Sequence, residues 1–190
     1  MNNGIRKIFE KNNGFLRSKE LTLRNQWYQL KQMVDNGEAI KLKSGLYCLP
    51  DYTVAGQDKE VTQMIPSGVF CLFTAWQHHN LTTHNPTEYH VAIERDSKIV
   101  LPDYPPIQLY RWSENFYTLG VVEIERIKVY DLEKSVCDAI RLRNKVGIDT
   151  TIEVLKNYVK RRDKNLNKLS RYATQMRVEN ILQTMIMPLL

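Results

Sequence analysis

The sequence predicts a mixed α+β protein, with an N-terminal winged helix-turn-helix followed by an α/β domain that has a small sheet and C-terminal helices. Three observations predict this class. Apolar residues in the first fifty positions recur at helical spacing, and a glycine turn between two short strands follows them. Near residue 90 apolar and polar residues alternate, which is typical of a half-buried strand, and helical patterns fill the chain after residue 131. We therefore expect two domains, over residues 1–50 and 51–190.

The first helix is expected near residues 3–12, where an apolar stripe repeats at i, i+3 and i+4: Ile5, Ile8 and Phe9. Residues 12–14, Asn-Asn-Gly, favour a turn and end this helix. Ser18 is placed to cap a second, short helix of about Lys19 to Leu21 or Leu23, and Glu20 suits the positive end of its dipole.

A longer third helix is expected next, and its buried face is marked by apolar residues at +4, +7 and +11: Leu23, Trp27, Leu30 and Val34. The opposite face presents polar side chains, with two cations at its flank: Asn25, Tyr28, Gln29 and Gln32, and Arg24 and Lys31. A solvated helix usually favours Glu and Lys on that face, whereas amides and a phenol can contact the edges of bases. Asn36-Gly37 then ends the helix.

Two short strands, Ala39 to Lys43 and Leu46 to Leu49, flank Ser44-Gly45 and predict a basic hairpin. Three helices and such a hairpin make the plan of a winged helix-turn-helix, in which one helix enters the major groove and the wing contacts phosphate. We therefore expect DNA contacts from Arg24, Asn25, Tyr28, Gln29, Gln32, Lys41, Lys43 and Ser44. The alternative interpretation is a small helical cap packed on the rest of the chain.

Positive charge is concentrated in the same segment. Residues 1–50 hold nine lysines and arginines and four acidic residues, a net charge of +5 out of +6 for the whole chain. The simplest partner for this segment is a polyanion, here double-stranded DNA, and a solvated basic surface is the other interpretation.

The second domain is expected to follow a polar connector over Asp51–Gln63. Strands are expected at Val69–Phe73, Tyr89–Glu94, Ile107–Trp112, Val121–Ile124 and Ile127–Val129, and a short helix capped by Thr74 through His79. Helices are expected over 131–144, 149–162 and 165–187, with Gly147 separating the first two. In the first of them Lys134 and Asp138 have the i, i+4 spacing of an ion pair. With Glu133, that pair either ties the helix to the sheet or contacts a partner.

No recognised catalytic motif is present, since the sequence lacks a Gly-rich phosphate loop, a Gly-x-Ser-x-Gly elbow and paired cysteines. We therefore expect no enzymatic activity, no cofactor and no metal. Four histidines lie within thirteen residues, without a Cys or carboxylate at a recognised ligand spacing: His78, His79, His84 and His90. Asp103, Glu123, Glu125 and Lys128 have the residue types of a magnesium nuclease. However, Glu125 and Lys128 are three apart and do not share a strand face.

The cysteines bear on the compartment. Cys48, Cys71 and Cys137 lie far apart in apolar stretches, as expected for buried thiols in a reducing cytosol. The chain also lacks an 18-residue apolar run and an N-terminal secretion signal. We expect a cytoplasmic protein with no membrane partner.

Five segments in order give the chain a resemblance to a known family: residues 14–21 (GFLRSKEL), 43–49 (KSGLYCL), 74–82 (TAWQHHNLT), 129–138 (VYDLEKSVCD) and 145–149 (KVGID). Together they resemble the AbiEi-type antitoxins of type IV toxin–antitoxin (abortive infection) systems. The resemblance implies a winged-helix domain that represses its own operon. It also implies a C-terminal α/β domain that counters a nucleotidyltransferase-like toxin, typically without a stable complex. The tight turn near Thr22 departs from the family and leaves the register of the base-reading residues open by one or two positions.

These expectations combine into a transcriptional repressor that binds its own promoter and acts as an antitoxin. The alternatives are a ligand-responsive winged-helix regulator and an enzyme that borrows the DNA-binding module. Two basic surfaces of the second domain are candidates either for partner contact or for solvation: Lys156, Lys160, Arg161 and Arg162, and the row Lys164, Lys168 and Arg171.

Overall fold

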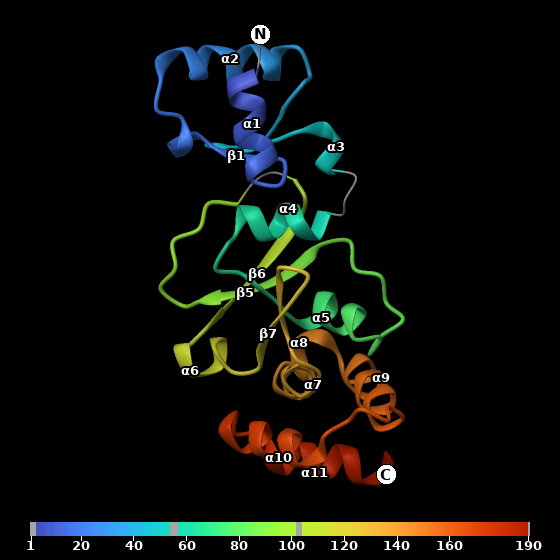
Figure 1. The fold of residues 1–190 in the computed structure, drawn as a ribbon. Helices are drawn as coiled ribbons and strands as arrows, with labels where there is room; N and C mark the ends of the chain where they lie inside the picture. Colours follow the sequence, from blue (N-terminus) through green and yellow to red (C-terminus); the bar gives the residue numbers. More distant parts are fainter. Residues whose placement is uncertain (1–2, 54–56, 102–103, 190) are drawn as a thin grey trace. The chain divides into compact units, whose positions relative to one another are not determined.

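The computed structural model describes residues 3–53, 57–101 and 104–189 (Figure 1). The chain forms two compact units: unit 1 comprises Met1–Pro66 and Ile99–Pro106, and unit 2 comprises Ser67–Lys98 and Ile107–Leu190. The expected boundary at residue 50 therefore falls inside unit 1. Two side-chain contacts explain why. Arg17 donates to the backbone carbonyl of Gln63 at 3.0 Å, and the Lys43 ammonium donates to that of Met64 at 2.5 Å.

Unit 1 contains α1 (Asn3–Lys11), β1 (Phe15–Arg17), the 3₁₀ turn η1 (Ser18–Glu20), α2 (Arg24–Asp35), β2 (Ile40–Lys43), β3 (Leu46–Cys48), α3 (Pro50–Thr53) and α4 (Gln57–Met64). Its sheet has the order β1-β3-β2, and both pairings are antiparallel. The expected first helix and hairpin are confirmed. The expected connector is largely helical, and its residues 54–56 lie outside the described residues. Sequence patterns miss β1, because three residues are too few for alternation to register.

The buried face of α2 differs from the expected one. Leu30 and Met33 are each 2% exposed, whereas Leu23 is 56% and Trp27 is 45% exposed. Leu23 precedes the helix in an extended conformation, so it does not share the helical face. The buried stripe is centred between Leu30 and Met33, which leaves Trp27 about 90° away from it around the axis. The core that α2 covers is small: Ile5, Phe9, Leu16, Leu21, Ala39 and Leu49.

Unit 2 is a mixed sheet covered by helices. Its strands are β4 (Val69–Phe70), β5 (Tyr89–Glu94), β6 (Ile107–Trp112), β7 (Val121–Ile124) and β8 (Ile127–Tyr130), in the order β6-β5-β4-β8-β7. β5 is parallel to β6 and β4 to β8, while the β4–β5 and β7–β8 pairs are antiparallel. Its helices are α5 (Leu72–His78), α6 (Glu114–Tyr117), α7 (Leu132–Arg141), α8 (Arg143–Val146), α9 (Ile148–Val159), α10 (Leu166–Gln175), α11 (Glu179–Ile186) and the turn η2 (Met187–Leu189). In Figure 1, α7 lies between the strands of unit 2 and the α10–α11 pair.

Two expected elements of unit 2 are corrected. The strand expected over 69–73 stops at Phe70, and α5 begins at Leu72 with Cys71 rather than Thr74 at its cap. The Thr74 hydroxyl accepts the backbone N–H of His90 at 2.9 Å, so it binds the sheet instead of capping the helix. The long last helix is divided into α10 and α11, because Arg177 between them has a left-handed φ of 58°.

Candidate functional site

An open groove of about 490 Å³ lies in unit 1, lined by residues of α2 and of the β2–β3 hairpin. Its lining combines two apolar side chains with three cations and three aromatic rings: Leu30 and Val34, Arg24, Lys31 and Lys41, and Trp27, Tyr28 and Tyr47. No carboxylate is among these lining residues. Cations beside flat aromatic faces are the combination with which proteins contact phosphates, sugars and bases.

The outward surface of α2 carries most of the residues expected to read DNA. Arg24, Asn25, Tyr28 and Gln32 are exposed, and Tyr28 is 66% exposed. The helix begins at Arg24, so Arg24, Asn25 and Tyr28 lie in its N-terminal half, the part of a recognition helix that meets base edges, whereas Gln32 lies nearer its C-terminal end. Sequence reasoning missed Gln26, whose side-chain oxygen accepts the backbone N–H groups of Thr22 and Leu23 at 2.9 and 3.0 Å. This contact satisfies two donors ahead of the helix and fixes where it begins.

Two expected DNA contacts are placed differently by the structure. Gln29 is half-buried rather than on the open face of α2. The Lys43 ammonium is bound to the carbonyl of Met64, and burial, followed by the nearby charge of Arg17, lowers the pKa of Lys43.

Ser44 is exposed, but the hairpin turn is fastened to η1. Gly45 accepts the backbone N–H of Ser18 at 2.8 Å, and a Cβ at Gly45 would lie 2.9 Å from the Ser18 hydroxyl oxygen. Lys41 remains an exposed cation on the hairpin.

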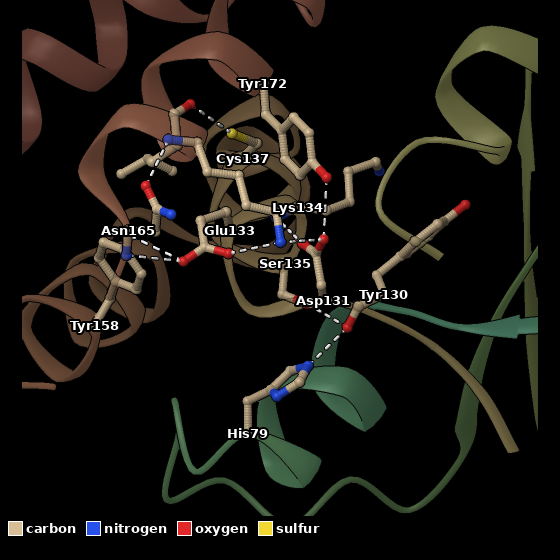
Figure 2. A network of polar contacts seen from close by, with 12 residues as sticks. His79, Tyr130, Asp131, Glu133, Lys134, Ser135, Cys137, Tyr158, Asn165 and Tyr172 are labelled. Carbon is tan, nitrogen blue, oxygen red and sulfur yellow. Dashed lines mark hydrogen bonds and ion pairs between the residues drawn. The ribbon is translucent and has the colours of Figure 1, made fainter. Parts of the chain in front are cut away.

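A polar network joins three helices of unit 2, and Figure 2 shows its members converging on the start of α7. Asp131 caps α7 by accepting the backbone N–H of Lys134 at 2.8 Å, and it also accepts the Tyr172 hydroxyl at 3.1 Å. Glu133 accepts the Tyr158 hydroxyl at 3.3 Å and the backbone N–H of Asn165 at 3.1 Å. Side chains from α9 and α10 therefore meet two carboxylates at the start of α7, which fixes the three helices to one another.

The expected Lys134–Asp138 ion pair is confirmed, at 2.5 Å, with both side chains fully buried. The Lys134 ammonium also lies 4.1 Å from the centre of the Tyr130 ring and 5.0 Å from that of Trp112. Burial raises the pKa of Asp138 against the opposing charge of Lys134, and its second oxygen has no hydrogen-bond partner among the described residues. Because the pair is inaccessible, it supports the structural interpretation and offers a partner no surface.

Three of the seven cations expected on the basic surface of unit 2 are held in internal contacts. Arg161 donates to both oxygens of Asp163 at 2.8 Å and to the carbonyl of His79 at 2.6 Å. Lys168 pairs with Asp131 at 2.9 Å and Glu133 at 3.3 Å. Lys164 precedes α10 and donates to the carbonyl of Arg161, so the expected row at i, i+4, i+7 does not form. The cations of this set that stay exposed are Lys156, Lys160, Arg162 and Arg171.

Two of the four histidines serve packing. A ring nitrogen of His79 lies 2.7 Å from the carbonyl of Tyr130, and one of His90 lies 2.9 Å from the Tyr110 hydroxyl. Burial, followed by the charge of His84, lowers the pKa of His90 to about 4. Within residues 3–53, 57–101 and 104–189, no three histidine, cysteine, aspartate or glutamate side chains gather as metal ligands would.

Two further findings concern alternatives raised by the sequence. Asp103 of the nuclease-like set lies outside the described residues, and Glu125 stands in the turn between β7 and β8 with a left-handed φ of 51°. Among the described helices, none has the length and apolar character needed to cross a bilayer.

Comparison with known proteins adds little to this geometry. No family model matches the chain. A stretch of 136 residues, 70% of this chain, is 27% identical to a Dictyostelium discoideum protein named "Putative mediator of RNA polymerase II transcription subunit 14". The match spans 9% of the length of that protein, and at this identity it assigns the chain to no family.

Proposed function

We propose that unit 1 is a winged helix-turn-helix that binds duplex DNA, with the exposed face of α2 in the major groove. The observation that carries this proposal is the α2–hairpin groove, where Arg24, Lys31 and Lys41 stand beside exposed aromatic rings and no carboxylate. Asn25 and Gln32 on the adjoining surface supply the amide donors and acceptors that distinguish base pairs.

The order of elements in unit 1 supports the proposal. A helix, a strand, a short helical turn, a longer helix and a hairpin follow one another, and β1 joins the hairpin as the third strand of its sheet. In the proposed winged helix-turn-helix, η1 takes the place of the first helix of the turn and α2 is the second.

The resemblance to AbiEi-type antitoxins extends the proposal to the whole chain. On that basis the protein represses its own promoter and counters a nucleotidyltransferase-like toxin in the cytoplasm, without acting as an enzyme. The printed name of the Dictyostelium protein points only to the broad area of transcription.

Gel-shift titrations of the full chain on a fragment of its own promoter test DNA binding. Three cations in the groove predict a slope of log affinity against log salt of about −2.7 if each neutralises one phosphate. Arg24→Ala should lower the affinity for specific and random duplexes alike. Gln32→Ala should reduce the difference in binding free energy between the specific and the random duplex, by about 1–3 kcal/mol for a bidentate contact.

Lys156→Ala is the matched control, since it removes an exposed cation from unit 2. Two results would contradict the groove as the DNA interface. One is an affinity that does not depend on salt, and the other is an equal loss of affinity in Arg24→Ala and Lys156→Ala.

A further inference from the structure

Unit 2 contains a second concave site, at the C-terminal end of α7. A pocket of about 350 Å³ is lined by Ser113, Asn115, Phe116, Arg141, Gln175 and Arg177. These residues come from three places: α6 with the residue before it, the end of α7, and the end of α10 with the residues after it. The volume is at the small end of the range for pockets that take small molecules. The lining holds two guanidinium groups and three neutral polar side chains, and no acidic one.

Arg141 is held in place before any ligand arrives. It donates one N–H to the carbonyl of Met176 at 2.9 Å, and its guanidinium lies 4.4 Å from the centre of the Phe116 ring. A guanidinium has five N–H donors. In the part of the chain that the structure describes, the others have no hydrogen-bond partner. An arginine that is already fixed loses little conformational freedom when it binds an anion.

Arg177 has a left-handed backbone conformation, which is energetically unfavourable for a residue with a side chain. The backbone N–H of Val178 bonds to the carbonyl of Ala173, and that of Arg177 to the carbonyl of Thr174, which together form a Schellman turn after α10. The left-handed residue of such a turn is usually glycine, because a Cβ is disfavoured there. Here it is an exposed arginine with φ of 58°, and no side-chain partner of it is found among the described residues.

The end of α10 would ordinarily repel an anion, because the last carbonyls of a helix carry negative partial charge. In this turn four of these carbonyls already accept hydrogen bonds. Met176 accepts from Arg141, Ala173 and Thr174 accept within the Schellman turn, and Tyr172 accepts the backbone N–H of Met176. The two guanidinium groups therefore decide the electrostatic character of the pocket.

We propose that this pocket binds a small molecule through a phosphate monoester group, held between Arg141 and Arg177. One guanidinium can bind both oxygens of a carboxylate. A dianionic phosphate monoester has three terminal oxygens, which can accept hydrogen bonds from two guanidinium groups. Ser113, Asn115 and Gln175 supply hydrogen bonds to the remainder of the ligand. The proposal is independent of DNA binding by unit 1.

Isothermal titration of the full chain, at constant ionic strength in chloride, tests the proposal with four probes: inorganic phosphate, glucose 6-phosphate, adenosine monophosphate and succinate. At least one phosphate ester should bind more tightly than succinate. Arg177→Gly should weaken that ester about tenfold or more, since it removes charge-assisted hydrogen bonds. Glycine is the favoured residue at this position, so the variant is expected to fold at least as well as the natural chain.

Two control variants make the result specific. Arg162→Gly and Lys156→Ala each remove an exposed cation from unit 2 outside the pocket, and both should leave the affinity unchanged. Three results would overturn the proposal. They are no binding of any ester at millimolar concentration, equal losses in Arg177→Gly and either control, and tighter binding of succinate than of every phosphate probe.

Discussion

Replacing Lys134 by methionine isolates the energetic role of the buried ion pair in α7. The variant keeps a side chain of similar length and leaves the Asp138 carboxylate fully buried without its counter-ion. Removing one partner of a buried pair costs about 3–5 kcal/mol. The loss of the cation above the Tyr130 ring acts in the same direction, and the new apolar contacts of Met act against it. We therefore expect Lys134→Met to lower the free energy of unfolding by about 3–5 kcal/mol at neutral pH.

The loss of unfolding free energy in Lys134→Met should become smaller as the pH falls. Burial already raises the pKa of Asp138, and without Lys134 only the smaller effect of the Arg141 charge opposes that shift. A carboxyl whose pKa is higher in the folded than in the unfolded state takes up a proton on folding, so its penalty shrinks as the pH falls. The difference between Lys134→Met and the natural chain should accordingly be smaller at pH 5 than at pH 7.5.

Urea titrations followed by tryptophan fluorescence measure this difference. Trp76 and Trp112 belong to unit 2, and a Trp27→Phe background removes the signal of unit 1. In the double variant Lys134→Met/Asp138→Leu, apolar side chains replace both charges, and its stability should be within about 1–2 kcal/mol of the parent or above it. Lys156→Met serves as the exposed control. A loss below about 1 kcal/mol for Lys134→Met, or additive losses in the double variant, would refute the account of the pair.

Three further predictions concern the stability of unit 2. The depressed pKa of His90 means that the unfolded state binds its proton first, so stability is full above about pH 6.5 and is lost as pH falls towards 4. In urea titrations His90→Gln should reduce the change in the free energy of unfolding between pH 7 and 5 by about 1–2 kcal/mol, and His78→Gln should not. Gly120→Ala should destabilise by about 2–4 kcal/mol, because φ is 69° there and a Cβ would lie 2.7 Å from that of Lys134; an unchanged thermal midpoint would contradict this. Arg177→Gly should stabilise by about 0.5–1 kcal/mol in the same assay, by relieving the left-handed backbone, and a loss would show that the arginine makes a structural contact.

Periodicity predicted the elements that are long enough to show it. The alternation at Tyr89–Glu94, the i, i+3, i+4 stripe of α1 and the helix expected from residue 131 all correspond to the structure. One cause of the failures is tertiary contact between residues far apart in sequence. Thr74 looks like a helix cap until the backbone N–H of His90 uses its hydroxyl.

The candidate site shows the same limit. Spacing assigned Trp27 to the core of unit 1, because a +4, +7, +11 pattern marks an apolar face without saying how far the helix is rotated. Met33, three residues after Leu30, lies on the face that is buried instead. The exposed Trp27 then belongs to the groove. Tyr47 also lines the groove, and the sequence around Trp27 could not predict this because Tyr47 lies twenty residues further along the chain.

Net charge in a segment measures its attraction to a polyanion only if the cations reach the surface. Among the nine cations of residues 1–50, Arg17 and Lys43 bind carbonyls at the end of α4, and Arg6 lies 3.7 Å from Glu10. The carbonyls that Arg17 and Lys43 contact lie beyond residue 50, which is why a boundary drawn from charge cut through a folded unit. The same contacts remove two charges from the expected phosphate-binding set. The three cations of the groove therefore predict a weaker salt dependence of DNA binding than the nine cations of residues 1–50 would. In the hairpin, the phosphate contact is assigned to Lys41 instead of Lys43.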